Sequence, residues 1–209
     1  MAEKRNFDSV ATTWDDEPRR VKLAREVADA VIGATKPTRE MDALDFGCGT
    51  GLLTLSLQPH VRNITGLDSS GGMLEILERK VEEQGLANLH TLFLDIEKGE
   101  RPSERFHLIA SAMTLHHVRD TAGLLRIFFD LLHPGGALCL ADLDREDGTF
   151  HDDPTGVVHF GFDRLEIMGM LAEAGFERVS AVTAAMIHKS SPQRTRDYPV
   201  FLISGRKPG

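Results

Sequence analysis

The chain has 209 residues, 41% hydrophobic and 27% charged, which predicts one globular domain over residues 1–209 with a sizeable core. Its formal net charge of −8 at pH 7 argues against a nucleic-acid partner, because nucleic-acid binders usually present a basic surface. The sequence shows no apolar signal segment and no 18-residue apolar run, and its two cysteines are too few for a disulfide framework, so we expect a cytoplasmic protein without membrane insertion.

The pattern of residues near the N-terminus predicts a helix over residues 17–34. Pro18 suits its first turn, and apolar residues recur along one of its faces. Those residues are Val21, Ala24, Val27, Ala28 and Val31. Trp14, the only tryptophan of the chain, precedes this helix and either packs against it or lines a pocket.

A glycine-rich turn follows the first predicted strand, which begins near Met41. The apolar run contains Asp45 and leads into Gly47-Cys48-Gly49-Thr50-Gly51, and an amphipathic stretch over 52–57 comes next. This order predicts a buried strand, a tight turn and the first turns of a helix. Glycine lets the backbone bend sharply and approach a ligand, and the helix behind the turn points its free amide groups at that ligand.

Two classes of ligand use such a turn. The fingerprint for a nicotinamide dinucleotide is G-x-G-x-x-G, but Leu52 occupies the third glycine position here. Asp45 would lie close to the pyrophosphate of a dinucleotide and would repel it. S-adenosylmethionine has no phosphate and is net cationic, so Asp45 would attract it. An ordinary corner without a ligand is the remaining alternative, since a glycine-rich turn alone is a weak signal.

Acidic residues follow the next two predicted strands. Asp68 comes after the strand over 63–67, close to the spacing at which a carboxylate meets the ribose hydroxyls of a bound nucleoside. Asp68 could instead cap the helix that follows, but Ser70 can do that alone. Asp95 comes after the strand over 89–94 and is either part of a binding site or an ordinary loop acid.

Two adjacent histidines follow the fourth predicted strand, over 106–111. In open parallel sheets the carboxyl ends of the strands beside the switch point form the binding crevice, so this stretch should face the glycine turn. On an extended backbone His116 and His117 cannot both point into one pocket, so we expect one to face the substrate and the other to pack or cap. Their spacing is not the i, i+4 pattern of a helical metal pair, and we expect no metal site.

The chain continues with a predicted helix over 121–132, the turn His133-Pro134-Gly135-Gly136 and a fifth strand over 137–143. The loop over 142–156 then carries six carboxylates. It is either solvated, a site for a hard cation, or a substrate-facing loop that prefers cations. The elements predicted after it are a helix over 164–174, a sixth strand over 176–183, a polar hairpin connection over 188–196 and a last strand over 198–206.

The stretch Leu44-Asp45-Phe46-Gly47-Cys48-Gly49-Thr50-Gly51 resembles the first motif of the class I S-adenosylmethionine-dependent methyltransferases, and later motifs over about residues 66–143 match in order and spacing. The motifs are similar to those of the small-molecule, quinone-biosynthesis-like group. The resemblance implies an α/β fold, namely a Rossmann-like three-layer sandwich with helices on both faces of a seven-stranded, mostly parallel sheet. The last strand should be antiparallel and inserted beside the sixth. An N-terminal helical lid over 1–35 should cover a core over 36–209.

The resemblance also implies S-adenosylmethionine as methyl donor and S-adenosylhomocysteine as product. The residues expected to bind the donor are Asp45, Gly47, Cys48, Gly49, Asp68, Ser69, Met73, Asp95, Ile96 and Ala112. In the family the acid at Asp95 accepts from the adenine amino group, and the segment over 157–162 covers the acceptor pocket. The residues expected to contact the acceptor are Trp14, His116, His159 and Phe160.

A methyl group on a sulfonium is already electrophilic, so the main task is in-line placement of the acceptor, to which orientation contributes roughly 7–11 kcal/mol. A base is needed only for an acceptor that must lose a proton before attack, and His116, then His159, are the candidates. Oxygen, nitrogen and carbon acceptors stay open, as does the oligomeric state. Two other interpretations are a non-catalytic S-adenosylmethionine-binding regulatory or assembly protein of the same fold, and a nicotinamide-dependent oxidoreductase, against which Leu52 and Asp45 argue.

Overall fold

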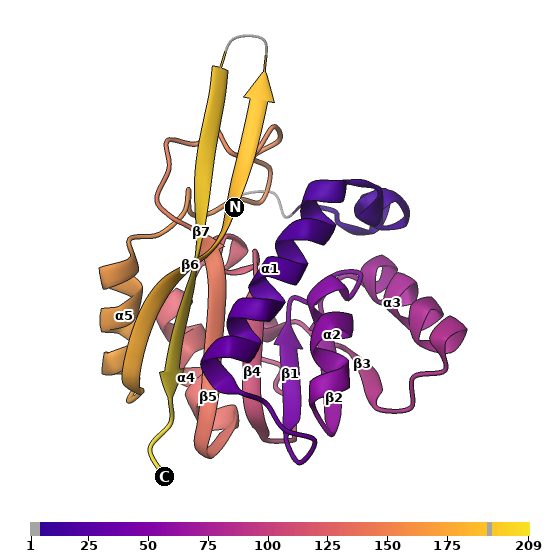
Figure 1. Cartoon of the computed structure of the whole chain (residues 1–209), viewed down its shortest axis with the longest axis vertical. Helices are drawn as coiled ribbons and strands as arrows, with labels where there is room; N and C mark the ends of the chain where they lie inside the picture. The colour runs from indigo at the N-terminus through magenta and orange to yellow at the C-terminus, as the bar shows by residue number, and fades with distance from the viewer. Residues whose placement is uncertain (1–4, 192–193) are drawn as a thin grey trace.

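The computed structural model describes residues 5–191 and 194–209, and its strands form a seven-stranded sheet in the order β3-β2-β1-β4-β5-β7-β6 (Figure 1). β7 runs antiparallel to both of its neighbours, and the other neighbouring strands are parallel. The strands are β1 Asp42–Phe46, β2 Asn63–Asp68, β3 Leu89–Phe93, β4 Phe106–Ala112, β5 Leu132–Leu143, β6 Glu177–Ser191 and β7 Arg194–Arg206. The last strand is therefore inserted between the fifth and the sixth, as the family resemblance implies.

Helices cover both faces of this sheet. One face carries α1 Pro18–Thr35, α2 Leu52–Leu57 and α3 Gly71–Gln84, and the other carries α4 Thr121–Leu131 and α5 Arg164–Glu173 (Figure 1). Each face has its own apolar core, because α1, α2 and α3 bury Val27, Leu57 and Leu77 in one cluster whereas α4 and α5 bury Phe128 and Leu171 in another. The arrangement confirms the expected three-layer α/β sandwich.

The order in which the strands are added to the sheet reverses at β1. This strand pairs with β2 on one side and with β4 on the other, although β4 follows β2 and β3 in the chain. Neighbouring loops part at such a switch point, which leaves a crevice outside the carboxyl ends of the strands. The glycine turn after β1 and the histidine segment after β4 therefore border the same space.

The largest difference from the sequence prediction is the hairpin of β6 and β7. The two strands pair as far as Ser191 and Arg194, so the predicted polar connection over 188–196 is for the most part strand. Figure 1 shows this hairpin projecting beyond the rest of the sheet. Strands that leave the layered core can carry polar residues on both faces, and cross-strand pairs such as His188 with Asp197 support them. The alternation of polar and apolar residues that marks a half-buried strand is absent there.

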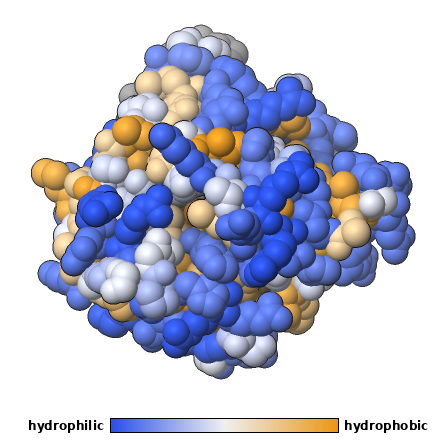
Figure 2. All heavy atoms as spheres, turned by 60° about the horizontal axis from the view of Figure 1, so that its bottom comes forward, coloured by the Kyte–Doolittle hydropathy of each residue, from blue (hydrophilic) through white to orange (hydrophobic). Residues whose placement is uncertain are grey.

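The surface opposite the crevice is mostly hydrophilic, with small separate hydrophobic areas (Figure 2). Among the residues that the structure describes, none of the helices combines the length and the apolar character needed to span a membrane. Cys48 and Cys139 are both buried and free.

Candidate methyl-transfer site

A cavity of about 1230 Å³ occupies the crevice at the carboxyl ends of the parallel strands. Its walls come from the glycine turn after β1, the ends of β2, β3 and β4, the N-terminal segment and the loop after β5. Ligand sites of α/β proteins are expected at this place, and the volume suits a ligand larger than a single small metabolite.

The glycine turn is held tightly against β2. The backbone amides of Gly47 and Cys48 both donate to the carbonyl of Leu67, at 2.8 and 3.0 Å. Gly47 has a φ of +69°, and a Cβ atom there would lie 2.3 Å from the side chain of Thr114. Only glycine meets both requirements, so the motif brings bare backbone to the cavity wall.

Asp45 lies beneath this turn and is almost completely buried, with 1% of its surface exposed. Burial raises the pKa of its carboxyl group to about 7; the hydrogen bond from the Thr54 hydroxyl, at 2.6 Å, opposes the rise, and the charge of Asp68 adds to it. A buried carboxylate without a cationic partner is costly, and a cationic ligand in the cavity would relieve that cost.

The end of β2 joins the turn to the following helix. One carboxylate oxygen of Asp68 accepts from the Gly49 amide at 2.8 Å and the other from the Ser70 amide at 2.9 Å. The Ser70 hydroxyl accepts from the Met73 amide and so caps α3, as the sequence predicts. This cap leaves Asp68 at the cavity wall instead of on the helix end.

The structure brings all the residues predicted to bind the donor to this one cavity. Asp95 is buried at the end of β3, where the ammonium of Lys98 lies 3.7 Å from its carboxylate. The cavity-lining residues of the predicted set are Asp45, Gly47, Cys48, Gly49, Asp68, Ser69, Met73, Asp95, Ile96 and Ala112. They come from four different strand ends and could be assembled only by the fold.

The N-terminal segment closes one side of the cavity. Its 3-10 helix η1 spans Asp8–Asp16. The Asp8 carboxylate accepts from the Gly72 amide of α3 at 2.8 Å, and Asp15 accepts from the Thr50 hydroxyl of the glycine turn at 2.6 Å. Trp14 lines the cavity. The guanidinium of Arg20 lies over the indole ring at 3.7 Å from its centroid.

A buried histidine–aspartate pair lies near the carboxyl ends of β4 and β5. His116 Nδ1 lies 2.8 Å from one carboxylate oxygen of Asp142, and the His116 backbone amide donates to the other at 3.1 Å. Burial favours the neutral acid at Asp142, but the His116 imidazole and the amides of His116 and Leu143 outweigh it and hold the pKa of Asp142 below its ordinary value. Because Nδ1 is engaged by the carboxylate, Nε2 is the ring nitrogen of His116 left for a ligand in the cavity that this residue lines.

Two more histidines pack against His116. The ring centroids of His117 and His151 lie 4.2 and 4.9 Å from that of His116. Burial and the neighbouring His116 lower the pKa of each to about 4, so both imidazoles are uncharged near neutral pH. His117 Nδ1 is satisfied by the carbonyl of Gly156 at 2.8 Å, whereas Nε2 of His151 is buried and has no hydrogen-bond partner among the described residues. His151 also lines the cavity, so one wall residue has an unsatisfied ring nitrogen.

His159 and Phe160 do not line the cavity, contrary to the sequence prediction. The backbone amides of Val158 and His159 both donate to the carbonyl of His116, so this segment runs along the outside of the histidine loop. His159 Nε2 lies 3.0 Å from the carbonyl of Val118, and Phe160 is 45% exposed. From this segment Val158 reaches the cavity instead.

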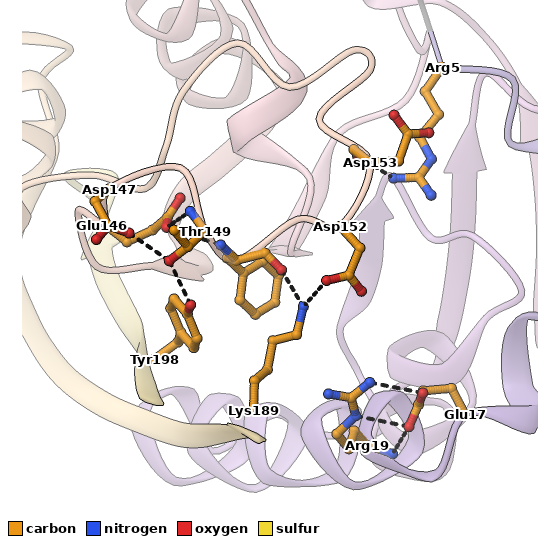
Figure 3. Close-up of polar contacts among 11 residues, drawn as sticks. Arg5, Glu17, Arg19, Glu146, Asp147, Thr149, Asp152, Asp153, Lys189 and Tyr198 are labelled. Carbon is orange, nitrogen blue, oxygen red and sulfur yellow. Dashed lines mark hydrogen bonds and ion pairs between the residues drawn. The ribbon is translucent and has the colours of Figure 1, made fainter. Parts of the chain in front are cut away.

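The acidic loop after β5 is held by basic side chains (Figure 3). Asp152 pairs with Lys189 at 2.9 Å, Asp147 pairs with Arg196, and both cations belong to the projecting β6–β7 hairpin. Within residues 5–191 and 194–209 no group of three or more histidine, cysteine or acidic side chains could hold a metal ion. Asp147 and Asp152 hold the loop to the β6–β7 hairpin through these ion pairs. Their geometry does not support the alternative of a substrate-facing loop that prefers cations.

Comparison with known proteins agrees with this geometry. A family model described as a methyltransferase domain matches residues 43–136. A ubiquinone biosynthesis O-methyltransferase of Coxiella burnetii is 29% identical over 95% of this chain and 92% of its own length. An uncharacterized methyltransferase of Schizosaccharomyces pombe is 30% identical over 69% of this chain, which spans 56% of that relative. The chain carries a methyltransferase domain.

The fold of the methyltransferase recurs in solved structures of low sequence identity. A phosphoethanolamine N-methyltransferase of Haemonchus contortus in complex with S-adenosyl-L-methionine superposes with a TM-score of 0.69 at 16% identity, over 87% of this chain and 52% of the other. Such a likeness concerns the fold alone. The acceptor of this methyltransferase has to be inferred from the residues around its own cavity.

Asp142 is the site residue that sequence reasoning missed. The sequence places it at the start of an acidic loop, where it resembles its solvated neighbours. In the structure it is the penultimate residue of β5 and has no exposed surface. The available signal was its position within an apolar strand, where a charged residue needs a buried partner.

Proposed function

We propose that the methyltransferase transfers a methyl group to a hydroxyl oxygen of a small acceptor, with His116 as general base. The observation that carries this proposal is the buried His116–Asp142 pair at the cavity wall. A base of this kind is needed when the acceptor must lose a proton as it attacks. Acceptors that already hold a free lone pair, such as a neutral amine, need no such pair.

In the proposed reaction the acceptor hydroxyl donates its proton to Nε2 of His116. An oxygen lone pair forms the new bond to the methyl carbon while the carbon–sulfur bond breaks, and its electron pair leaves with sulfur as neutral S-adenosylhomocysteine. Asp142 is a positioning residue: it fixes the tautomer that leaves Nε2 free and stabilises the imidazolium that forms. Solvent takes the proton after the product leaves.

The donor is proposed to lie along the glycine turn, with its nucleoside toward Asp68 and Asp95. Asp68 is proposed to accept from the ribose hydroxyls and Asp95 from the adenine amino group. The backbone at Gly47 allows the close approach of the amino-acid tail, whose ammonium group faces Asp45. Residues 1–35 are proposed to act as the lid over this donor, which the contacts of Asp8 and Asp15 with the core support.

Donor affinity is expected to depend on the ionisation of Asp45. The pKa of this carboxyl group is raised to about 7, and its ionised form attracts the cationic donor, so affinity should rise with pH and level off above about 7. Below that pH the affinity should fall by up to about tenfold per pH unit. Calorimetric titration of S-adenosylmethionine over this range measures the slope. The Asp45→Asn variant should bind weakly at every pH and lack the slope; a wild-type affinity that does not change with pH would remove Asp45 from the donor site.

The proposed reaction can be tested by transfer from S-adenosylmethionine labelled in its methyl group to metabolite extracts. The labelled product, isolated and examined by nuclear magnetic resonance, should carry the methyl group on oxygen. Label found only on nitrogen or carbon would contradict the proposal. Donor binding without transfer to any compound would favour the alternative of a regulatory or assembly protein of the same fold.

We also propose that the methyltransferase acts in the cytoplasm on a small molecule and not on nucleic acid. The two buried free cysteines suit a reducing compartment, and the net charge of −8 disfavours a polyanionic partner.

A further inference from the structure

The wall of the cavity near the N-terminal segment carries several cations. Arg5, Arg19, Arg20 and Lys189 all line this part of the cavity. Most of them have an anionic or carbonyl partner within the protein, as Figure 3 shows. Arg19 forms a two-point pair with the Glu17 carboxylate at 2.9 and 3.0 Å, and Lys189 pairs with Asp152.

Arg20 differs from Arg19 and Lys189, which pair with carboxylates. Among the residues that the structure describes, no carboxylate lies within ion-pair distance of its guanidinium, although the side chain is partly buried. One N–H donates to the backbone carbonyl of Trp14 at 2.9 Å, and the flat group rests on the indole ring. Glu17 and Asp15 are the acids whose charges act on Arg20. Glu17 already pairs with Arg19, and Asp15 accepts from Thr50 and pairs with Lys80.

The position of Arg20 is therefore fixed while most of its hydrogen-bonding capacity is unused. A guanidinium has five N–H donors in a planar fork that matches a carboxylate, and stacking on an aromatic ring keeps the fork oriented. Burial lowers the pKa of Arg20 from its ordinary value; among the neighbouring charges Glu17 and Asp15 raise this pKa, whereas Arg5 and Arg19 lower it.

We propose that Arg20 binds a carboxylate group of the ligand that fills the cavity. Two ligands of the reaction could bring this group, namely the acceptor and the amino-acid tail of the donor. The inference rests on the proposed function for the identity of the cavity as the methyl-transfer site. It adds a specificity residue in the first turn of α1.

The test has one arm for each source of the carboxylate and uses binding alone. In the donor arm, calorimetry compares S-adenosylhomocysteine with 5′-methylthioadenosine, which lacks the amino-acid tail. In the acceptor arm, benzoate is compared with benzyl alcohol on protein saturated with S-adenosylhomocysteine. Each comparison is made in the wild type, in Arg20→Gln and in Arg20→Lys. Arg25→Gln is the matched control, because Arg25 is an exposed arginine of the same helix and does not line the cavity.

Arg20→Gln is expected to weaken the carboxylate ligand of one arm about ten- to hundredfold and to leave the uncharged ligand of that arm unchanged. Arg20→Lys should retain part of the preference, and Arg25→Gln all of it. The arm in which the preference falls identifies the source. Equal affinities of wild type and both Arg20 variants in both arms would overturn the inference, as would equal losses for charged and uncharged ligands. Because no arm requires turnover, failure to methylate a hydroxyl would refute the proposed function and leave this result standing.

Discussion

Replacing His116 with alanine should lower turnover about 10²- to 10⁴-fold, the usual contribution of a general base, while the affinity for S-adenosylhomocysteine stays near the wild-type value. The reason is that His116 is proposed to accept the proton of the acceptor and is not among the residues expected to bind the donor. Single-turnover rates and calorimetric titration on the same preparation separate the two effects. Equal losses in rate and in donor affinity would show that His116 is structural.

Two further variants sharpen this prediction. Asp142→Asn keeps the shape of the pair but removes the charge that stabilises the imidazolium, so it should also lower turnover and should change the pH profile of the rate. His159→Asn is the matched control, because His159 lies nearby in the fold, contacts the carbonyl of Val118 and the ring of Phe162, and does not line the cavity. If the His159 variant were as slow as the His116 variant, the loss of rate would not single out His116 as the base, and the proposed mechanism would be contradicted.

Replacing Asp68 with alanine should weaken donor binding by about 1–3 kcal/mol, the range for lost hydrogen bonds to a charged group. Asp68 also accepts from the amides of Gly49 and Ser70, so the variant loosens the turn that the donor contacts. The dissociation constant of S-adenosylmethionine, measured by calorimetry, is the direct readout.

The control for Asp68 is Asp163→Ala. Asp163 likewise accepts from two backbone amides, those of Leu165 and Glu166, but it does so at the start of α5 and outside the cavity. Its loss should lower thermal stability without changing donor affinity. An Asp68 variant that binds the donor as tightly as the wild type would remove this carboxylate from the ribose.

Much of the fold could be predicted because its signals are local. The helix over 17–34 and the strand before Gly47 are fixed by apolar spacing and by turn residues, and the structure places α1 at Pro18–Thr35 and β1 at Asp42–Phe46. The order of motifs along the chain, with the family resemblance, also predicted that the donor-site residues would meet at one crevice. These features depend on neighbours in sequence or on a known topology.

The features that sequence reasoning missed depend on pairing between distant segments. Asp142 meets His116 because β4 and β5 lie side by side with Ala112 opposite Ala141, a register that no local pattern of either strand reveals. His159 was expected at the acceptor because of its place in the chain, but hydrogen bonds to the His116 carbonyl turn its segment outward. The projecting tip of the β6–β7 hairpin, over 188–191 and 194–196, consists of polar residues, so it lacks the periodicity by which strands are found.

The most direct test of the account concerns which nucleoside ligand occupies the crevice after β1. Melting curves of the wild-type protein should be recorded with S-adenosylmethionine, S-adenosylhomocysteine, NAD and NADP at equal concentrations. Because a ligand that binds only the folded state raises its stability, the two adenosyl sulfur compounds should raise the melting temperature and the two dinucleotides should leave it unchanged. A rise with a dinucleotide, or none with either adenosyl compound, would contradict the assignment of Asp45, Asp68 and Asp95 to a cationic donor.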